Sequence, residues 1–186
     1  KNMETLIKFF ISDFQDGSLK PADFIIAVPS DITEVEKRAF YDLVKDAGVK
    51  AKKIMVVEKA VADGLGMDID VKTSQGVIVV NVGYDTTEIS ILSLGGIVLS
   101  RLIKVGGAKF DEAIRNAVRK EFSLIIGGKT AENIKTIIPE LDKSGKGAIV
   151  YGRDIVTGLP VEREIPTKLV IDTLEEHFNT IIDNVK

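Results

Sequence analysis

The pattern of apolar and polar residues changes twice between residues 77 and 92. Residues 77–80 form an unbroken run of Val and Ile, which is typical of a strand covered on both faces. After a polar turn, apolar and polar residues alternate over 87–92, as in a strand with one covered face. Gly83 lets backbone N–H groups of the turn approach an anion. The stretch therefore predicts two strands joined by a turn, which either binds an anion or is a purely structural hairpin.

The first part of the chain predicts an amphipathic helix over residues 2–15, because apolar side chains recur there at helical spacing. A membrane-surface helix is one alternative. Such helices usually carry several Lys or Arg beside the apolar face, and here Lys8 is the basic residue near the middle of the polar face. We therefore expect the apolar stripe to face a core.

Four elements are predicted next, in the order strand, helix, strand and helix: residues 24–28, 34–47, 53–57 and 58–66. Thr33 and Glu36 form a capping box at the start of the first of these helices, since each side chain can satisfy a free N–H group. This alternation predicts a βαβ unit with a mainly parallel sheet.

The remainder of the chain predicts a third strand of a hairpin meander and then a mixed helical and hairpin region. Its expected elements are a strand at 97–104, a helix at 108–122, a helix from Thr130 to Pro139, strands at 147–153 and 161–165, and a last helix from Pro166. Asp111 and Glu112 lie in the first turn of the helix at 108–122, where the helix dipole favours carboxylates, so capping is favoured over catalysis.

Composition narrows the class of protein. Hydrophobic residues make up 45% of the 186 residues and charged residues 28%, as in a globular protein. The net charge is -3 and basic residues are dispersed, so we expect no nucleic-acid partner. The chain has no cysteine, and it has no apolar run of the roughly 18 to 20 residues that span a bilayer. We expect a cytoplasmic location.

A set of motifs carries a resemblance to a known family. The two that carry most of it are NVGYDTTE at 81–88 and VGGAKFDEAI at 105–114. Others follow or precede them in order, at 28–39, 58–62, 126–135, 152–154 and 158–160. Together they resemble the MreB family of bacterial actins, which help determine rod shape. The resemblance covers nearly the whole chain.

The resemblance implies an α/β fold of actin-like ATPase lobes, related to ribonuclease H, that is incomplete here and has a small inserted α+β subdomain. Residues 1–72 would belong to the first lobe. Residues 73–127 and 166–186 would form the core of the second lobe, and residues 128–165 the inserted subdomain. We expect the family's first phosphate-binding hairpin to precede residue 1 and its adenosine loop to follow residue 186.

The resemblance also implies the cofactors ATP and Mg²⁺ and a set of site residues. Glu58 would look towards the attacking water, and Asn81 would stand at the Mg²⁺ position. The expected nucleotide contacts are Gly83, Tyr84, Asp85, Thr86 and Thr87 in the phosphate loop, Gly106 and Gly107 under the nucleotide, and Glu132 and Lys135 at the ribose and base. Backbone donors would hold phosphate, and a carboxylate would orient water.

Several residues depart from the family pattern. Asn81 replaces an aspartate, Tyr84 and Asp85 replace two glycines, and Lys59 replaces a glutamate. Ala60 and Ala108 replace a proline and an acidic residue. A carboxylate at Asp85 would repel phosphate, because two like charges about 4 Å apart repel by roughly 1 kcal/mol even in water. Neutralisation of Asp85 by Lys59 is an open alternative.

Two main hypotheses follow from these features. The first is a nucleotide-dependent, filament-forming protein of cell shape, which self-associates and works with the cell-shape machinery at the inner membrane face. The second is a non-hydrolysing scaffold or adaptor on the same fold, motivated by the departures at Asn81, Tyr84, Asp85 and Lys59. A chaperone or sugar kinase on this fold is disfavoured, because the inserted segment is short.

Overall fold

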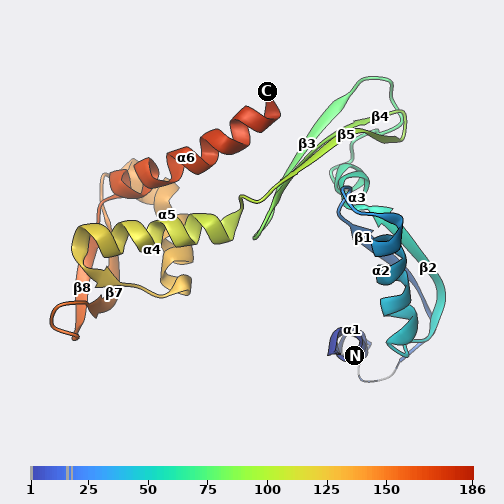
Figure 1. The fold of residues 1–186 in the computed structure, drawn as a ribbon, viewed down its shortest axis with the longest axis horizontal. Coiled ribbons are helices and arrows are strands. Elements are labelled where there is room, and N and C mark those ends of the chain that lie inside the picture. Colours follow the sequence, from blue (N-terminus) through green and yellow to red (C-terminus); the bar gives the residue numbers. More distant parts are fainter. Residues whose placement is uncertain (1, 16, 18) are drawn as a thin grey trace. The chain divides into compact units, whose positions relative to one another are not determined.

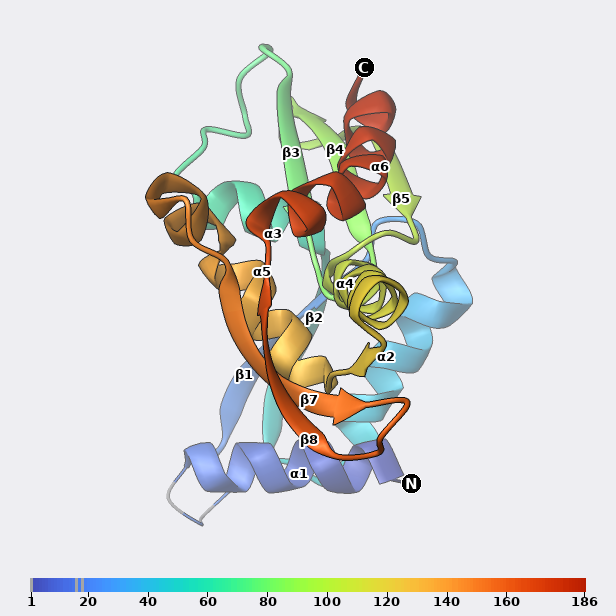
Figure 2. The same ribbon diagram turned by 90° about the vertical axis from the view of Figure 1, so that its left-hand side faces the viewer.

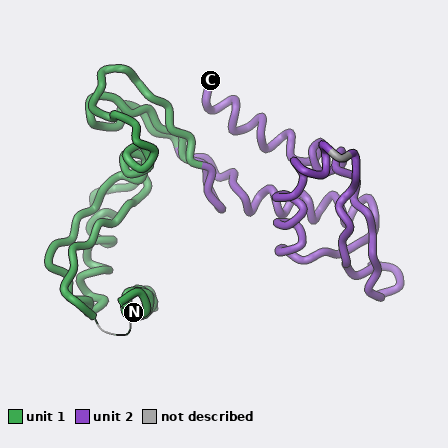
Figure 3. Tube along the Cα trace, turned by 180° about the vertical axis from the view of Figure 1, so that it is seen from behind, with its two compact units in different colours: residues 1–81, 88–101 green, residues 82–87, 102–186 purple. Residues whose placement is uncertain are grey.

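The structure is a computed structural model that describes residues 2–15, 17 and 19–186. The chain divides into two compact units, which Figure 3 shows in different colours. Unit 1 comprises residues 1–81 and 88–101, and unit 2 comprises residues 82–87 and 102–186.

Unit 1 contains the predicted βαβ arrangement. Strand β1 (Ala22–Val28) pairs in parallel with strand β2 (Ala51–Glu58), and Val28 lies opposite Glu58 at the carboxyl end of the pair. Helix α2 (Glu34–Asp46) connects the two strands and packs along them (Figure 1). The prediction of a parallel pair joined by a helix is confirmed.

Helix α2 begins at the predicted capping box. The Thr33 hydroxyl accepts a hydrogen bond from the Glu36 N–H, and the Glu36 carboxylate accepts one from the Thr33 N–H. Both bonds satisfy N–H groups that the first helical turn leaves free. The chain leaves the helix through Gly48 at a φ of +70°, a conformation that glycine adopts at little cost.

Helix α1 (Asn2–Phe14) lies where the periodicity predicts it, but its apolar stripe is not buried. Met3 is 55% exposed, Phe10 59% and Phe14 90%. The expectation of a core-facing stripe is therefore wrong for these residues. The physical reason is that α1 packs mainly against α2, and one neighbouring helix cannot cover the whole stripe.

The meander consists of β3 (Val77–Val82), β4 (Thr87–Ser93) and β5 (Gly96–Ile103), with β4 in the middle. The predicted hairpin order is confirmed, but the predicted burial is reversed. In β3, Ile78 and Val82 are about half exposed, whereas in β4 the residues from Thr87 to Ser90 are all buried. Both faces of β4 are thus covered, and its buried polar side chains each have a hydrogen-bond partner: Thr87 with Val105, Glu88 with Ser30 and Ser90 with Ser100.

Helix α3 (Lys59–Gly66) packs on β3 and β4 through the apolar cluster of Ala60, Val71, Val79 and Leu92. Gly64 makes this close packing possible. A Cβ atom there would lie 2.7 Å from Leu92 Cδ1 and 3.1 Å from Val71 Cγ1, so a larger residue would force these buried side chains to shift.

Unit 2 surrounds one apolar core. Helices α4 (Gly107–Phe122), α5 (Gly128–Ser144) and α6 (Thr167–Val185) pack with a three-stranded sheet of order β6-β7-β8 (Figure 2). Strands β7 (Ala148–Asp154) and β8 (Pro160–Ile165) form the predicted antiparallel hairpin. Strand β6 (Leu124–Ile125) was not predicted, since two residues are too short to show a period.

The prediction that Pro139 ends a helix is wrong, because α5 continues through it to Ser144. Proline removes one hydrogen bond and costs about 3 kcal/mol in a helix interior. Ile138 and Leu141 are partly buried against the unit 2 core, where full burial of such a side chain contributes roughly 1.5 to 3 kcal/mol. This packing offsets part of the cost of the proline, and the helix ends only at Gly145, whose φ is +66°.

Among residues 2–15, 17 and 19–186, no helix is long and apolar enough to cross a membrane. The mixed α/β architecture agrees with the predicted fold class. The assignment of residues 1–72, 73–127 with 166–186, and 128–165 to lobes and an inserted subdomain stays a prediction.

Candidate functional site

The turn between β3 and β4 has Tyr84 and Asp85 at its tip. The Gly83 N–H donates to the Thr86 carbonyl over 2.9 Å and closes the turn. Both tip residues are exposed, and within the described residues their backbone N–H groups have no hydrogen-bond acceptor. These two N–H groups are therefore the backbone donors that the turn can offer to an anion.

Two backbone hydrogen bonds join the turn to the start of helix α4. The Gly107 N–H donates to the Gly83 carbonyl over 3.0 Å, and the Ala108 N–H donates to the Tyr84 carbonyl over 2.7 Å. A helix N-terminus normally has free N–H groups that attract anions. Here the turn uses two of them, so they serve the fold rather than a ligand.

Gly106 allows this close approach. A Cβ atom at Gly106 would lie 2.7 Å from the carbonyl oxygens of both Gly83 and Tyr84. Both neighbours are backbone atoms and cannot move aside cheaply. The predicted contact residues Gly106 and Gly107 thus lie directly against the predicted phosphate loop.

The two threonines after the tip differ in their surroundings. Thr87 is fully buried, and its hydroxyl donates to the Val105 carbonyl over 2.8 Å. Thr86 is half-buried and closes the turn through its carbonyl. The Thr87 hydroxyl is therefore committed to the fold, whereas Thr86 remains at the edge of the turn.

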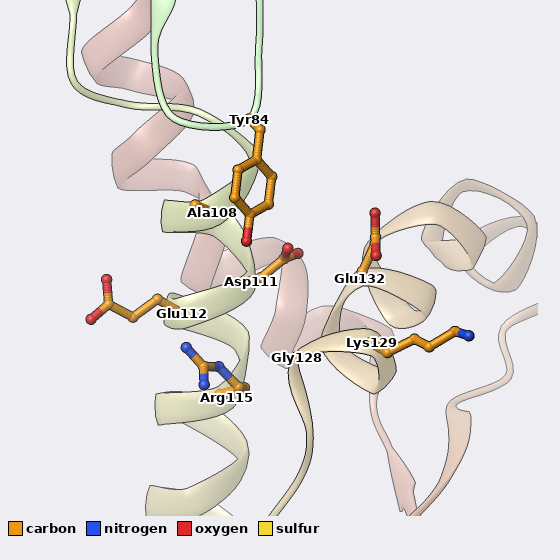
Figure 4. A pocket seen from close by; sticks show the side chains of 8 residues that line it. All are labelled: Tyr84, Ala108, Asp111, Glu112, Arg115, Gly128, Lys129 and Glu132. Carbon is orange, nitrogen blue, oxygen red and sulfur yellow. The ribbon is translucent and has the colours of Figure 1, made fainter. Parts of the chain in front are cut away.

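A pocket of about 560 Å³ lies beside the turn, between helices α4 and α5 (Figure 4). Its size is within the range of small-molecule sites. It is lined by Tyr84, Ala108, Asp111, Glu112, Arg115, Gly128, Lys129 and Glu132. Two of the predicted site residues, Tyr84 and Glu132, are thus in its walls. We call it the α4–α5 pocket.

An ion pair at one wall joins the two helices. Lys135 Nζ lies 2.7 Å from Asp111 Oδ1 and 3.5 Å from the Gly107 carbonyl oxygen. The exposed fraction of the side chain is 22% for Lys135 and 9% for Asp111. Helix α4 begins at Gly107 and has no acidic residue in its first turn, so the expectation that Asp111 and Glu112 cap it there is wrong. Asp111 does not stand free for catalysis either, because it is ion-paired. Lys135 holds it and also contacts the predicted nucleotide turn.

Sequence reasoning missed four residues of the pocket walls. These are Ala108, Arg115, Gly128 and Lys129, with Ala108 noted only as a departure from the family pattern. A signal for the α4 wall was present, because residues 108, 111, 112 and 115 follow helical spacing and share a face. The α5 wall had no such signal, since its place depends on the packing of α5 on α4.

Glu58, the predicted catalytic residue, belongs to unit 1 and ends strand β2. Its carboxylate lies 3.1 Å from Lys37 Nζ of helix α2. A hydrogen bond from its own backbone N–H, and then the Lys37 ammonium, lower the pKa of Glu58. An ionised carboxylate can orient water, but it is a poor proton acceptor at neutral pH.

Asn81, the predicted metal residue, also belongs to unit 1. Its amide donates a short hydrogen bond to the carboxylate of Asp63 on helix α3. The pair offers the Asn81 amide oxygen and the Asp63 carboxylate, which are donors that Mg²⁺ accepts. Among the described residues no three His, Cys, Asp or Glu side chains form a metal cluster. The donors thus fit a largely hydrated Mg²⁺ that keeps several waters, and not an ion enclosed by protein ligands.

Comparison with known families gives a match along the entire chain. A family model described as MreB/Mbl protein matches residues 1–186. The cell shape-determining protein MreB of Haemophilus influenzae is 32% identical over 190 residues, which cover 98% of this chain and 53% of that protein. The cell shape-determining protein Mbl of Bacillus subtilis is 35% identical over 188 residues, covering 98% and 55%. The chain spans about half the length of the curated relatives it matches.

Solved structures give the same picture of the fold. The crystal structure of MreB 5 of Spiroplasma citri bound to AMPPNP is 35% identical and superposes with a TM-score of 0.86, covering 98% of this chain and 55% of that one. The MamK double helical filament is 21% identical with a TM-score of 0.74, covering 98% and 54%. At that identity the second likeness concerns the fold alone.

Proposed function

The chain belongs to the MreB/Mbl protein family, and from this membership we propose that it acts as an actin-like cell-shape protein that binds ATP with Mg²⁺ and forms filaments. The observation that carries the proposal is the family match along all 186 residues. The resemblance drawn from the motifs, and with it the actin-like fold, is confirmed.

Nucleotide binding is supported by two structures of a relative. MreB 5 of Spiroplasma citri has been solved bound to AMPPNP and, at 34% identity and a TM-score of 0.84, bound to ADP. In this chain the α4–α5 pocket adjoins the turn whose N–H groups at Tyr84 and Asp85 have no acceptor among the residues that the structure describes. We assign the phosphates to the turn side and the sugar and base to the pocket, where Glu132 would reach them, with Lys135 beside the pocket on Asp111.

The remaining site residues take roles that their surroundings permit. Asn81, with Asp63, would hold waters of a hydrated Mg²⁺. The positive charge of the ion would offset the negative charge of the phosphates. Glu58, ionised beside Lys37, would orient the attacking water. Gly106 and Gly107 would support the turn from below.

Sedimentation tests the filament proposal. The protein that carries this chain, at the length of its relatives, is spun with ATP, AMPPNP, ADP or no nucleotide, and pellets are checked by electron microscopy. We expect pelleted filaments that depend on nucleotide. No assembly with any nucleotide would count against the proposal.

A second candidate is a non-hydrolysing scaffold or adaptor on the same fold. It is favoured by the exposed Tyr84 and Asp85 at the tip of the turn, where the family pattern has two glycines. Asp85 would repel the phosphates, and Tyr84 adds bulk beside them.

Phosphate release separates the two candidates. At saturating Mg-ATP, a steady release rate from the unsubstituted protein would remove the scaffold. If release is absent, the double substitution Tyr84→Gly with Asp85→Gly tests whether the turn is the cause, and we expect it to raise the rate. Leu94→Gly is the matched control, because Leu94 is the exposed residue of another hairpin turn, between β4 and β5.

A further inference from the structure

Tyr84 presents an aromatic ring to the α4–α5 pocket from a backbone that cannot easily move. Its carbonyl accepts the Ala108 N–H, and its ring edge lies 3.6 Å from where a Cβ atom of Gly107 would be. Figure 4 shows the ring extending from the turn along the pocket towards the level of Asp111 and Glu132. The loop thus fixes the Cα–Cβ bond from which this ring extends.

The ring has no aromatic partner within the described part of the chain. The ring contacts there join Phe9 to Phe10 and Phe110 to His177 and Phe178, and the one cation–π contact joins Arg38 to Tyr41. Tyr84 is 66% exposed. An aromatic side chain that is fixed at its base, exposed and unstacked offers a free face to a flat ligand.

The opposite wall offers hydrogen-bond acceptors. Asp111 is neutralised by Lys135 and Glu112 pairs with Lys109, whereas Glu132 has no ion-pair partner among the described residues. In Figure 4 the Glu132 carboxylate stands across the pocket from the Tyr84 ring. A carboxylate accepts hydrogen bonds from sugar hydroxyls, as acidic residues do in dinucleotide sites.

These observations identify a ligand with a flat ring and a polyol. We propose that Tyr84 is a specificity-determining residue whose ring packs against the nucleoside part of the bound nucleotide, opposite Glu132. The family pattern has glycine at this position, so the contact is a property of this chain. The inference rests on the proposed nucleotide binding. On this inference the nucleoside part of the ligand supplies most of the binding free energy, since the Asp85 carboxylate repels the phosphates at the turn.

The chain has three tyrosines and no tryptophan, which makes the inference testable by ¹⁹F NMR. Incorporated 3-fluorotyrosine gives three signals, which single Tyr→Phe variants assign. The chain is titrated with adenosine, Mg-ADP and Mg-pyrophosphate. We expect adenosine and Mg-ADP to shift the Tyr84 signal with saturation, and pyrophosphate to shift it clearly less, because it lacks the ring that would pack on Tyr84. Tyr151, which lies in the same unit and is 70% exposed, is the matched control and should not move.

A substitution gives the second arm. Tyr84→Ala should weaken adenosine binding, measured by saturation-transfer NMR of the ligand, by at least about fivefold, because one base–aromatic contact is worth that much or more. Tyr151→Ala should leave it unchanged. Unshifted Tyr41 and Tyr151 signals in Tyr84→Ala verify that the chain still folds.

The outcomes separate the two proposals. Binding of Mg-ADP that is unchanged or tightened by Tyr84→Ala overturns the role of Tyr84 and leaves the proposed function standing. A Tyr84 signal that responds to pyrophosphate as strongly as to adenosine also overturns it. If the unsubstituted chain binds none of the three ligands, nucleotide binding by this chain fails, and the role of Tyr84 falls with it.

Discussion

The amide of Asn81 donates a hydrogen bond to the carboxylate of Asp63, and this contact links strand β3 to helix α3. The family pattern has an aspartate at position 81. In this chain the negative charge of that position is therefore carried by the partner on the helix, and the pair has a single negative charge. Asn81 supplies both a donor to Asp63 and an oxygen for a ligand.

Asn81→Asp is expected to loosen the contact between α3 and β3, because two carboxylates would replace a donor and an acceptor. Loss of a hydrogen bond to a charged group costs about 1.5 to 3 kcal/mol. Amide hydrogen exchange in α3 measures this locally, and exchange should become faster at neutral pH. Adding Asp63→Asn restores a donor–acceptor pair and should restore protection. Unchanged exchange in Asn81→Asp would mean that the contact does not stabilise unit 1.

Gly106→Ala is expected to displace the predicted phosphate loop from α4. The new Cβ atom would meet two carbonyl oxygens at 2.7 Å, and overpacking of this kind costs about 1 to 3 kcal/mol. Exchange of the Gly107 and Ala108 amides should become faster. Gly128→Ala is the control, since a Cβ atom there meets nothing within 4 Å. Equal effects of both substitutions would contradict the close approach.

Lys135→Met is expected to destabilise unit 2 strongly, because it leaves the buried Asp111 carboxylate without its partner. Breaking a buried pair costs about 3 to 5 kcal/mol. Lys109→Met is a matched control, since it breaks the pair with Glu112 on the same helix, where the side chains are 54% and 49% exposed. That change should cost at most about 1 kcal/mol. Urea denaturation of both variants measures the change in the free energy of unfolding. Amide hydrogen exchange in α4 then compares the local effect of the two substitutions.

The elements that could be predicted are those whose signals are local. The Thr33 capping box needs only residues three apart, and the β1 to β2 arrangement needs only the alternation of periods along the chain. The phosphate-loop hairpin also has its signal within one stretch, at 77–92. Each of these is decided by backbone and side-chain chemistry of neighbouring residues.

The features that were missed depend on distant partners. The continuous apolar run of β3 predicts a fully covered strand, but what covers its two faces is set by segments distant in sequence, and one face of β3 is exposed. Pro139 would end an isolated helix. In the protein, Leu141 packs on the unit 2 core and stabilises the helix beyond the proline. Lys135 meets Asp111 from 24 positions away, so no local pattern marks the pair.

Lys37→Met tests whether Lys37 stabilises the ionised Glu58 carboxylate, and the pKa of Glu58 is the quantity that reports it. The bonds from its own N–H and from Lys37 lower the pKa of Glu58 from its ordinary value of 4.5. A lowered folded-state pKa contributes stability above that ordinary value, and this stability is lost as the pH falls through the folded pKa. Lys37→Met should move the pKa of Glu58 upward in a carboxyl ¹³C NMR titration. The side chains are 28% and 40% exposed, so the loss of stability at pH 7 should be at most about 1 kcal/mol.

Arg38→Met is the matched control for this titration. It breaks the neighbouring exposed pair with Asp42, whose side chain is 40% exposed, and does not touch Glu58. If Lys37 holds Glu58, the pKa of Glu58 moves in Lys37→Met and stays in Arg38→Met, and the Lys37→Met variant approaches the unsubstituted chain in stability at acid pH. A pKa of Glu58 that stays low without Lys37 would show that the backbone bond suffices. Glu58 would then remain an ionised water-orienting group without help from α2, and Lys37 would have no part in the proposed site.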